Sequence, residues 1–200
     1  MEELEDDSCF LPPGYVQFNV DRFRNEMVSA HNHYRTLHGS KHLVILPELE
    51  QSAQEWADAI ATRGYLQYSD LKNIGENICS LEISSGVPSG KEVVRLWYKE
   101  IKHYSFSEPG WKRGAFHFTQ MMWKSTTHIG IGIAPVPEQP RLFMVARYFP
   151  AGNSNMPGEF HKNVLPRISK RSESSPGMDD SFMKMFSGRL KSFVLEDAFV

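Results

Sequence analysis

Apolar residues recur every three or four positions in several segments of the chain, a spacing that predicts amphipathic helices. The first long segment ends at Gly39, a residue type that often terminates helices. The second begins at Pro47, whose missing N–H suits a first helical turn, and it ends at Gly64. Two shorter segments have the same spacing. The predicted helices cover residues 20–39, 47–64, 91–104 and 116–124.

Two later segments have the pattern of strands. Isoleucine and glycine alternate over 129–133, which predicts a strand with another element packed closely on its glycine side. Residues 142–149 are apolar on both faces except at Arg147, as is typical of a central strand covered on both sides. The proline-rich turn at 136–140 joins the two strands as a hairpin. Helices on both sides of a small sheet predict a three-layer α/β/α sandwich.

Composition and charge divide the chain into three parts. Its 200 residues are 40% apolar and 12% aromatic, which is enough for the core of one domain. The first ten residues carry five acids and no base, whereas residues 170–180 form a run rich in serine and charge. We therefore expect a disordered acidic N-terminus over 1–15, one domain over 16–166 and a flexible tail over 167–200.

The net charge and the number of cysteines limit the expected binding partners and the expected cellular compartment. A net charge of −2 creates no broad positive field, so nucleic acid is not an expected partner. Cys9 and Cys79 are the only cysteines, too few for a disulfide framework, which favours a reducing compartment. The N-terminus is acidic where a secretory signal is basic, and no apolar run approaches the ~18 residues of a membrane span. We expect an intracellular protein without a signal peptide or a transmembrane helix.

Three short strings occur in an order and spacing that resemble the CAP superfamily, which groups cysteine-rich secretory proteins, insect antigen 5 and plant pathogenesis-related 1 proteins. The strings are GEN at 75–77, HFTQMMWKST at 117–126 and FMVARYFPAGN at 143–153. The resemblance covers about 18–166. WYKEIKHYSF at 97–106 makes the chain most similar to the intracellular, Golgi-associated branch. The α/β/α sandwich that the resemblance implies agrees with the hydrophobic pattern.

The resemblance also implies a cleft tetrad of two histidines and two glutamates, which in several members holds a divalent metal such as zinc. By motif, Glu76, Glu100 and His117 occupy three of these positions, and Tyr68 stands where the second histidine is expected. A neutral phenol is a poor zinc ligand at pH 7. We therefore expect no resident cofactor, with zinc doubtful and these three residues as weak metal candidates. The alternative for the cleft is a hydrogen-bonded network in which Tyr68 donates its hydroxyl to a carboxylate.

Other candidates for chemistry are weaker. Glu100 and His103 form an E-x-x-H pair on one predicted helix, a spacing that chance produces easily in this chain. On the first predicted helix, His31 is expected at the edge of the core and His33 in solvent. The chain has no G-x-S-x-G elbow and no cysteine in a protease context. No catalytic residue is therefore nominated, and any enzymatic activity would depend on the tetrad.

The ends of the chain bear on membrane binding. Glu2 stands where N-myristoylation requires glycine, so we expect no myristoyl anchor. Apolar residues alternate with basic ones at a helical spacing over 182–193, which could form a short amphipathic helix on a membrane surface. Ala146 replaces a cysteine that belongs to a disulfide set in secreted relatives, which favours an intracellular location.

The expected function is that of a non-enzymatic intracellular binding or scaffold protein, at membranes or with protein partners. Binding of a membrane lipid or a sterol is implied by the resemblance alone, and a protein partner or a homodimer is open as well. The alternative is a metal-dependent, hydrolase-like enzyme that uses the residual tetrad. A third interpretation is a degenerate relative whose cleft has no function. For location, peripheral attachment at Golgi membranes follows from the branch, and the alternative is an extracellular protein, as in most of the superfamily.

Overall fold

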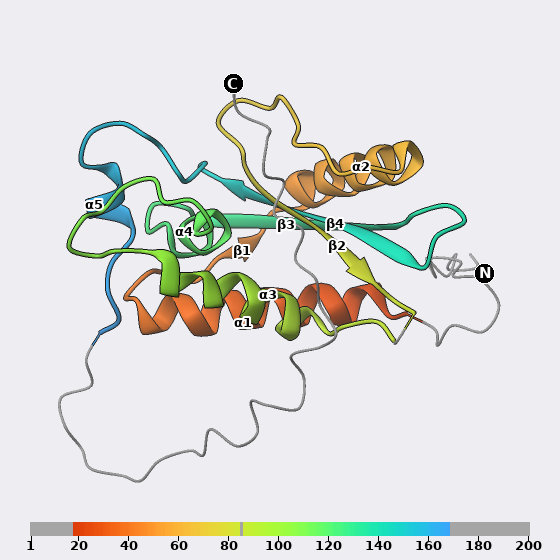
Figure 1. Cartoon of the computed structure of the whole chain (residues 1–200), viewed down its shortest axis with the longest axis horizontal. Helices are drawn as coiled ribbons and strands as arrows, with labels where there is room; N and C mark the ends of the chain where they lie inside the picture. The colour runs from red at the N-terminus through yellow and green to blue at the C-terminus, as the bar shows by residue number, and fades with distance from the viewer. Residues whose placement is uncertain (1–17, 85, 169–200) are drawn as a thin grey trace, which may run out of the picture.

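The computed structural model describes residues 18–84 and 86–168, which form one mixed four-stranded sheet between two helical layers (Figure 1). The segments 1–15 and 182–193, for which we predicted disorder and an amphipathic helix, lie outside the described residues. The helices are α1 (Val20–Leu37), α2 (Pro47–Arg63), α3 (Gly90–Lys99), the 3-10 helix η1 (Glu100–His103), α4 (Phe116–Met122) and α5 (Glu159–Asn163). The strands are β1 (Val44–Ile45), β2 (Gly75–Glu82), β3 (His128–Pro135) and β4 (Arg141–Phe149).

The sheet has the strand order β1-β3-β4-β2, with β1 parallel to β3 and the other pairs antiparallel. Strands β3 and β4 form the expected hairpin, and β4 lies in the interior of the sheet between β3 and β2. Residues 142–148 of β4 are all buried, including Arg147. The three-layer sandwich predicted from the hydrophobic pattern is therefore confirmed.

Helix α2 covers one face of the sheet, and the glycines of β3 explain how closely it packs there. A Cβ atom added to Gly130 would lie 2.3 Å from the carbonyl carbon of Leu49, and one added to Gly132 would lie 2.3 Å from the backbone of Ala53. Only glycine allows this approach of backbone to backbone. The close element predicted on the glycine side of this strand is thus α2, whose C-cap Gly64 has a φ of 78°.

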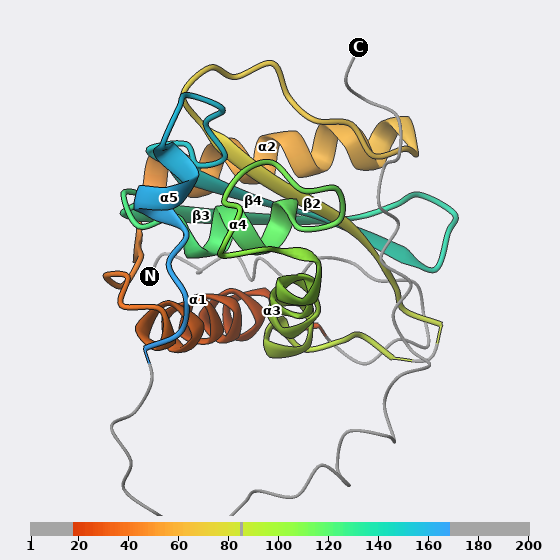
Figure 2. The same ribbon diagram turned by 60° about the vertical axis from the view of Figure 1, so that its left-hand side comes forward.

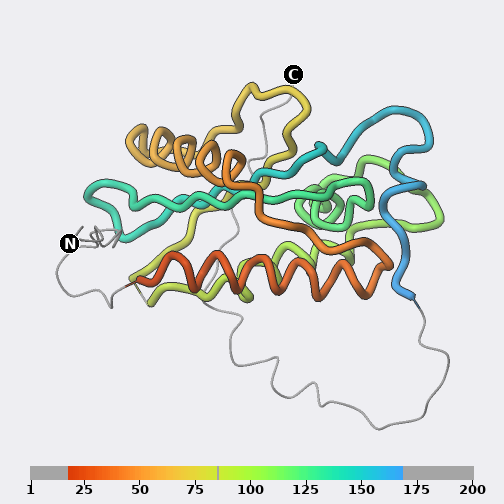
Figure 3. The backbone as a smooth tube through the Cα atoms, turned by 180° about the vertical axis from the view of Figure 1, so that it is seen from behind, coloured from red at the N-terminus to blue at the C-terminus, as the bar shows by residue number. Residues whose placement is uncertain are grey.

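Helices α1, α3 and α4 cover the opposite face, where α1 and α3 run side by side (Figure 2). Seen from behind, the sheet separates α1 from α2 along the length of the molecule (Figure 3). This layer contains large buried side chains, such as Met27, Trp97 and Phe118. Gly90 lets α3 begin against α1, because an added Cβ would lie 2.3 Å from the carbonyl oxygen of Phe23.

Three elements, β1, α5 and β2, were not predicted. Strand β1 has two residues and α5 has five, which is too short for a periodic pattern. Strand β2 is interrupted by polar residues, among them Glu76 and Asn77, whose partners lie on other elements. The helix predicted to reach residue 104 changes at Glu100 to the 3-10 helix η1. Among the described residues, no helix combines the length and the apolarity needed to cross a bilayer.

Candidate functional site

Glu76 lies on β2 in a row of side chains that faces α2. Register pairs it with Arg147 on β4, and Arg147 with Gly130 on β3. The Nε of Arg147 donates to Oε2 of Glu76 at 3.1 Å, and both side chains are at least nine-tenths buried. Ser69 also binds Glu76: it donates its backbone N–H to Oε1 at 2.8 Å and its hydroxyl to Oε2 at 3.0 Å. Both oxygens of Glu76 therefore have hydrogen-bond donors within the chain.

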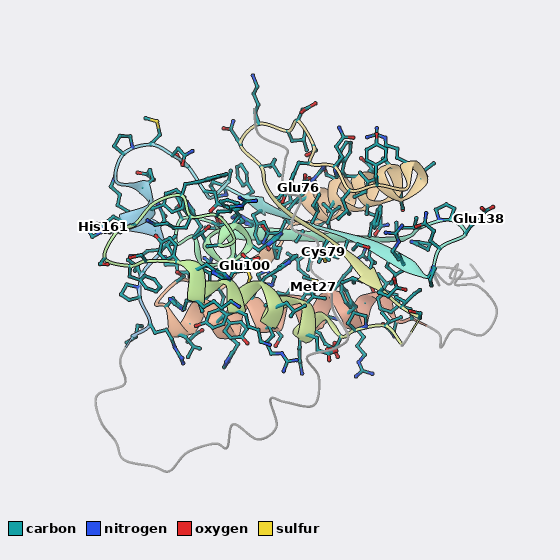
Figure 4. The ribbon with its side chains drawn as sticks, in the orientation of Figure 1. Met27, Glu76, Cys79, Glu100, Glu138 and His161 are labelled. Carbon is teal, nitrogen blue, oxygen red and sulfur yellow. The ribbon has the colours of Figure 1, made fainter. Side chains whose placement is uncertain are left out.

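Glu100 lies on the other side of the sheet, at the start of η1, as Figure 4 shows. Its Oε2 accepts from the backbone N–H groups of His117 and Phe118 at 3.0 and 3.1 Å, and its Oε1 contacts Nδ1 of His117 at 2.6 Å. The N-cap of α4 is Ala115, which has no capping side chain. Glu100 supplies the missing cap from another element, since a carboxylate at a helix N-terminus satisfies free amides and is favoured by the helix dipole.

His117 is fixed by Glu100 and by an aromatic ring. Its imidazole is parallel to the Trp97 ring, with an angle of 6° and a centroid separation of 5.3 Å. Because the carboxylate of Glu100 can only accept, Nδ1 carries the proton of this contact. The other nitrogen, Nε2, is buried and has no hydrogen-bond partner among the described residues. His117 thus offers one lone pair that the described part of the chain does not use.

Tyr68, which stands where the family resemblance led us to expect a histidine, is half-buried and directly precedes the Ser69 that binds Glu76. Burial raises its pKa to about 12, and the negative charges of Glu76 and Glu100 add to the effect. The hydroxyl is therefore protonated at neutral pH. Its predicted role as donor to a carboxylate is not what the structure shows for Glu76, because Ser69 and Arg147 fill that role.

Tyr68 and Glu76 line a cavity of about 450 Å³, a volume suited to a small ligand, which we call the cleft. Glu100 and His117 are not among its lining residues. Trp111 is 47% exposed and packs on Phe116 with 4.0 Å between ring centroids, which gives the cleft an apolar wall. Side chains with amide groups line the cleft as well. The residues used below are Tyr68, Ser69, Glu76, Asn77, Trp111 and Gln120.

The donor set of the cleft does not fit zinc. Zinc sites take imidazole or thiolate ligands together with available carboxylates. Here the second imidazole is replaced by a phenol with a pKa of about 12, and both carboxylates already accept several hydrogen bonds. Across residues 18–84 and 86–168, no cluster of three or more His, Cys, Asp or Glu side chains could hold a metal ion.

The other histidines considered from sequence do not join the cleft as ligands. His103 is exposed, and Glu100 turns to His117 instead, so the E-x-x-H pair does not converge. His33 is exposed, as expected. His31 is fully buried, whereas a position at the edge of the core was expected. Its two ring nitrogens contact the carbonyl of Met27 at 2.8 Å and the hydroxyl of Tyr148 at 2.9 Å.

A buried polar network, not foreseen from the sequence, connects α1 to the cleft. Nδ1 of His31 donates to the Met27 carbonyl, so Nε2 accepts from the Tyr148 hydroxyl. The amide of Asn77, at the cleft, donates to the same hydroxyl at 3.2 Å and to the carbonyl of His117 at 3.3 Å. Sequence reasoning missed this network and the roles of Ser69 and Arg147. The one available signal was the charge of Arg147 in an otherwise apolar strand, which requires a buried partner.

Comparison with known proteins identifies the family of the chain and agrees with its fold. A sequence model of the CAP family, described as "Cysteine-rich secretory protein family", matches residues 28–148. The chain belongs to this family. Over 145 residues this CAP protein is 42% identical to human Golgi-associated plant pathogenesis-related protein 1, an alignment that covers 72% of this chain and 94% of that protein.

Two further relatives extend the comparison. Protein PRY2 of Saccharomyces cerevisiae is 32% identical over 154 residues, which cover 72% of this chain and 41% of that protein. Among solved structures, the "Structure of BmVAL-1" matches with a TM-score of 0.54 at 26% identity, over 72% of this chain and 84% of that one. The CAP fold and the likeness to a Golgi-associated homologue are thus established.

Proposed function

We propose that this CAP protein is a non-enzymatic binding module. The observation that carries the proposal is the state of the two carboxylates at the tetrad positions, Glu76 in the cleft and Glu100 beside His117. A general base or a metal ligand needs a carboxylate lone pair that is available to the substrate or the ion. Glu76 is held by Arg147 and Ser69, and Glu100 caps α4 and orients His117. These carboxylates serve the architecture of the cleft, which leaves the cavity to bind a ligand without transforming it.

The proposed ligands are chosen from the size and lining of the cleft and from the CAP family. A cavity of about 450 Å³ with an aromatic wall suits an apolar or amphipathic molecule, such as a membrane lipid or a sterol, better than a small ion. A protein partner or a second copy of the chain could cover the exposed ring of Trp111. For location, the Golgi-associated homologue supports an intracellular protein held peripherally at Golgi membranes.

One observation favours a second candidate, a metal-dependent, hydrolase-like activity. The Nε2 lone pair of His117 is buried without a partner, and an unpaired buried acceptor is costly unless something binds it. In that case His117 would be the one strong ligand of a weak site. The binding function is preferred because one imidazole alone does not hold zinc tightly.

Calorimetric titration with zinc separates the two functions. The unmodified chain is expected to show no binding at micromolar zinc, because only one imidazole is available. Tyr68→His restores a second imidazole between the carboxylates and should tighten zinc binding by at least about tenfold. Tyr68→Phe is the matched control, since it removes the hydroxyl and adds no ligand, and it should behave as the unmodified chain does. Micromolar or tighter binding by the unmodified chain would overturn the proposal.

A further inference from the structure

A second cavity lies between α1 and α3, on the face of the sheet opposite α2. Its volume is about 380 Å³, and it shares no lining residue with the cleft. His33 and Tyr34 line it from α1, and Lys91, Glu92 and Arg95 line it from α3. We call it the α1–α3 groove. Figure 2 shows α1 and α3 next to each other in the helical layer on the side of the sheet away from α2.

The groove contains cations without anionic partners. Nε of Arg95 is buried and has no hydrogen-bond partner, and neither Arg95 nor Lys91 forms an ion pair within the described part of the chain. A buried N–H of a charged group is among the most costly groups to leave unpaired. This arrangement therefore calls for an acceptor from outside the described residues.

The nearby acids do not supply that acceptor. Oε2 of Glu92 accepts from the backbone N–H and the hydroxyl of Ser89, in a capping box at the start of α3. Glu26 is held by Arg22 through one oxygen and by the N–H of Gly90 through the other. Glu92 adds a negative charge to the lining, but neither it nor Glu26 forms an ion pair with Arg95 or Lys91 in the described residues, so Nε of Arg95 receives no acceptor from either.

A stacked aromatic pair adjoins the cations of the groove. Tyr34, which lines the groove, stacks on Tyr98 with ring centroids 3.8 Å apart and an angle of 12°. Burial raises the pKa of Tyr34, while the positive charges of Arg95 and Arg167 oppose that rise. Arg167 is exposed and follows the segment that His38 anchors through the Leu165 carbonyl.

We propose that the α1–α3 groove binds a phosphate group, carried either by a lipid headgroup or by a soluble phosphate ester. A phosphate offers several strong acceptor oxygens and a charge of about −1.5 to −2 at pH 7, which matches the set of unpaired cations. Arg95 donates from Nε and its terminal nitrogens in the fork geometry that suits phosphate, and Lys91 adds a point charge from the same lining. Such a site would add a second contact beyond the ligand of the cleft.

Thermal unfolding of the full chain with sn-glycerol 3-phosphate, and with glycerol as the uncharged control, tests the soluble source. The ester should raise the Tm of the unmodified chain and glycerol should not. Arg95→Gln should abolish this rise and weaken binding at least about tenfold, since it removes a charged donor. Lys99→Gln, which removes an exposed cation at the end of the same helix, is the matched control and should keep the rise. Because Nε of Arg95 has no partner, Arg95→Gln should not lower the Tm without ligand.

Sedimentation with phosphatidylcholine vesicles, with and without phosphatidic acid, tests the lipid source with the same variants. Binding that needs phosphatidic acid and Arg95 assigns the site to a headgroup, whereas a response to the soluble ester alone assigns it to a soluble ligand. Either result supports the site. If Arg95→Gln does not fold, Lys91→Gln replaces it, because that side chain is exposed. Equal responses of the groove variants and the unmodified chain, or no response to either probe, would overturn the proposal. Tyr68→His should change neither assay, which keeps this test independent of the cleft.

Discussion

The two faces of the sheet are packed by different means. On the α2 face, glycines bring the helix backbone onto the strands, and small residues such as Ala53 and Ala57 fill the interface. On the α1 face, large side chains fill the space and polar groups are buried among them. Both faces also bury an arginine, and the partners of these two arginines differ in kind.

Arg35 on the α1 face has no carboxylate partner within residues 18–84 and 86–168. Its guanidinium donates to four backbone carbonyls, those of Lys41, Met121, Trp123 and Thr126, at 2.8 to 2.9 Å. Burial lowers its pKa to about 10, which leaves it charged at neutral pH. Arg147 on the α2 face instead pairs with Glu76 at the cleft. Arg35 thus holds backbone segments together through their carbonyls, whereas Arg147 forms an ion pair with a carboxylate of the candidate site.

The largest effect is expected at Arg35. Arg35→Met leaves the carbonyls of Lys41, Met121 and Thr126 without this donor, while the carbonyl of Trp123 keeps the N–H of Thr126. Each unpaired carbonyl costs about 1–3 kcal/mol, so the free energy of unfolding should fall by more than about 4 kcal/mol. Arg35→Lys keeps the charge but offers at most three donors. Its free energy of unfolding should lie between those of the unmodified protein and Arg35→Met. Urea unfolding measures both. A loss below about 1 kcal/mol for Arg35→Met would show that these loops do not depend on the guanidinium.

A slightly smaller effect is expected at the cleft. Glu76→Gln leaves the buried Arg147 charge without compensation and should cost about 3 kcal/mol. Arg147→Met should cost a similar amount, but the double variant should cost clearly less than the sum, because the second change removes the stranded charge. A double-mutant cycle from urea unfolding gives the coupling free energy. Additive losses would mean that Glu76 and Arg147 are not paired.

The buried network on the α1 face predicts a dependence on pH. Burial lowers the pKa of His31 from 6.5 to about 4, so the unfolded chain takes up this proton before the folded protein does. The contribution of neutral His31 to the free energy of unfolding should therefore be fully present above about pH 6.5. The free energy of unfolding should fall by up to about 3 kcal/mol as the pH drops to 4.

The matched variant for this prediction is His31→Gln, which cannot take up the proton. It should be less stable at pH 7 but show a flatter profile between pH 6.5 and 4. Burial also lowers the pKa of His38, so some slope should persist. Identical slopes for both proteins would exclude His31 as the source.

The smallest effect is expected where α2 meets the sheet. Gly130→Ala puts a Cβ within 2.3 Å of the α2 backbone, and moving the helix away should cost about 2 kcal/mol. Gly110→Ala is the control, since its Cβ would meet no atom within 4 Å and should leave stability unchanged or slightly raised. Thermal unfolding compares the two. Equal Tm values would show that α2 does not need the glycine contact.

Elements with a regular apolar spacing are predicted from the sequence, whereas an element with buried polar residues is not. Periodicity reveals α1, α2 and the β3–β4 hairpin, because their apolar residues face one layer at regular spacing. It misses β2, where Glu76 and Asn77 are buried among partners from distant segments. A single-sequence pattern records polarity but not the partner that makes burial possible.

Motif resemblance nominated Tyr68, Glu76, Glu100 and His117 but not the hydrogen bonds that they make. In the structure Tyr68 and Glu76 line one cavity, and Glu100 contacts His117. The resemblance gave no sign that Glu100 caps α4, because the cap and the helix are separated by a loop whose path depends on tertiary packing. The consequence for function, that both carboxylates are occupied, emerges only from the hydrogen bonds.

The most direct test of the account is the state of His117, observed by NMR of its ring nitrogens with and without zinc. The account predicts that Nδ1 carries the proton of the contact with Glu100 and that the Nε2 resonance does not move when equimolar zinc is added. An Nε2 resonance that moves with zinc would contradict the claim that the protein binds its ligand without a metal.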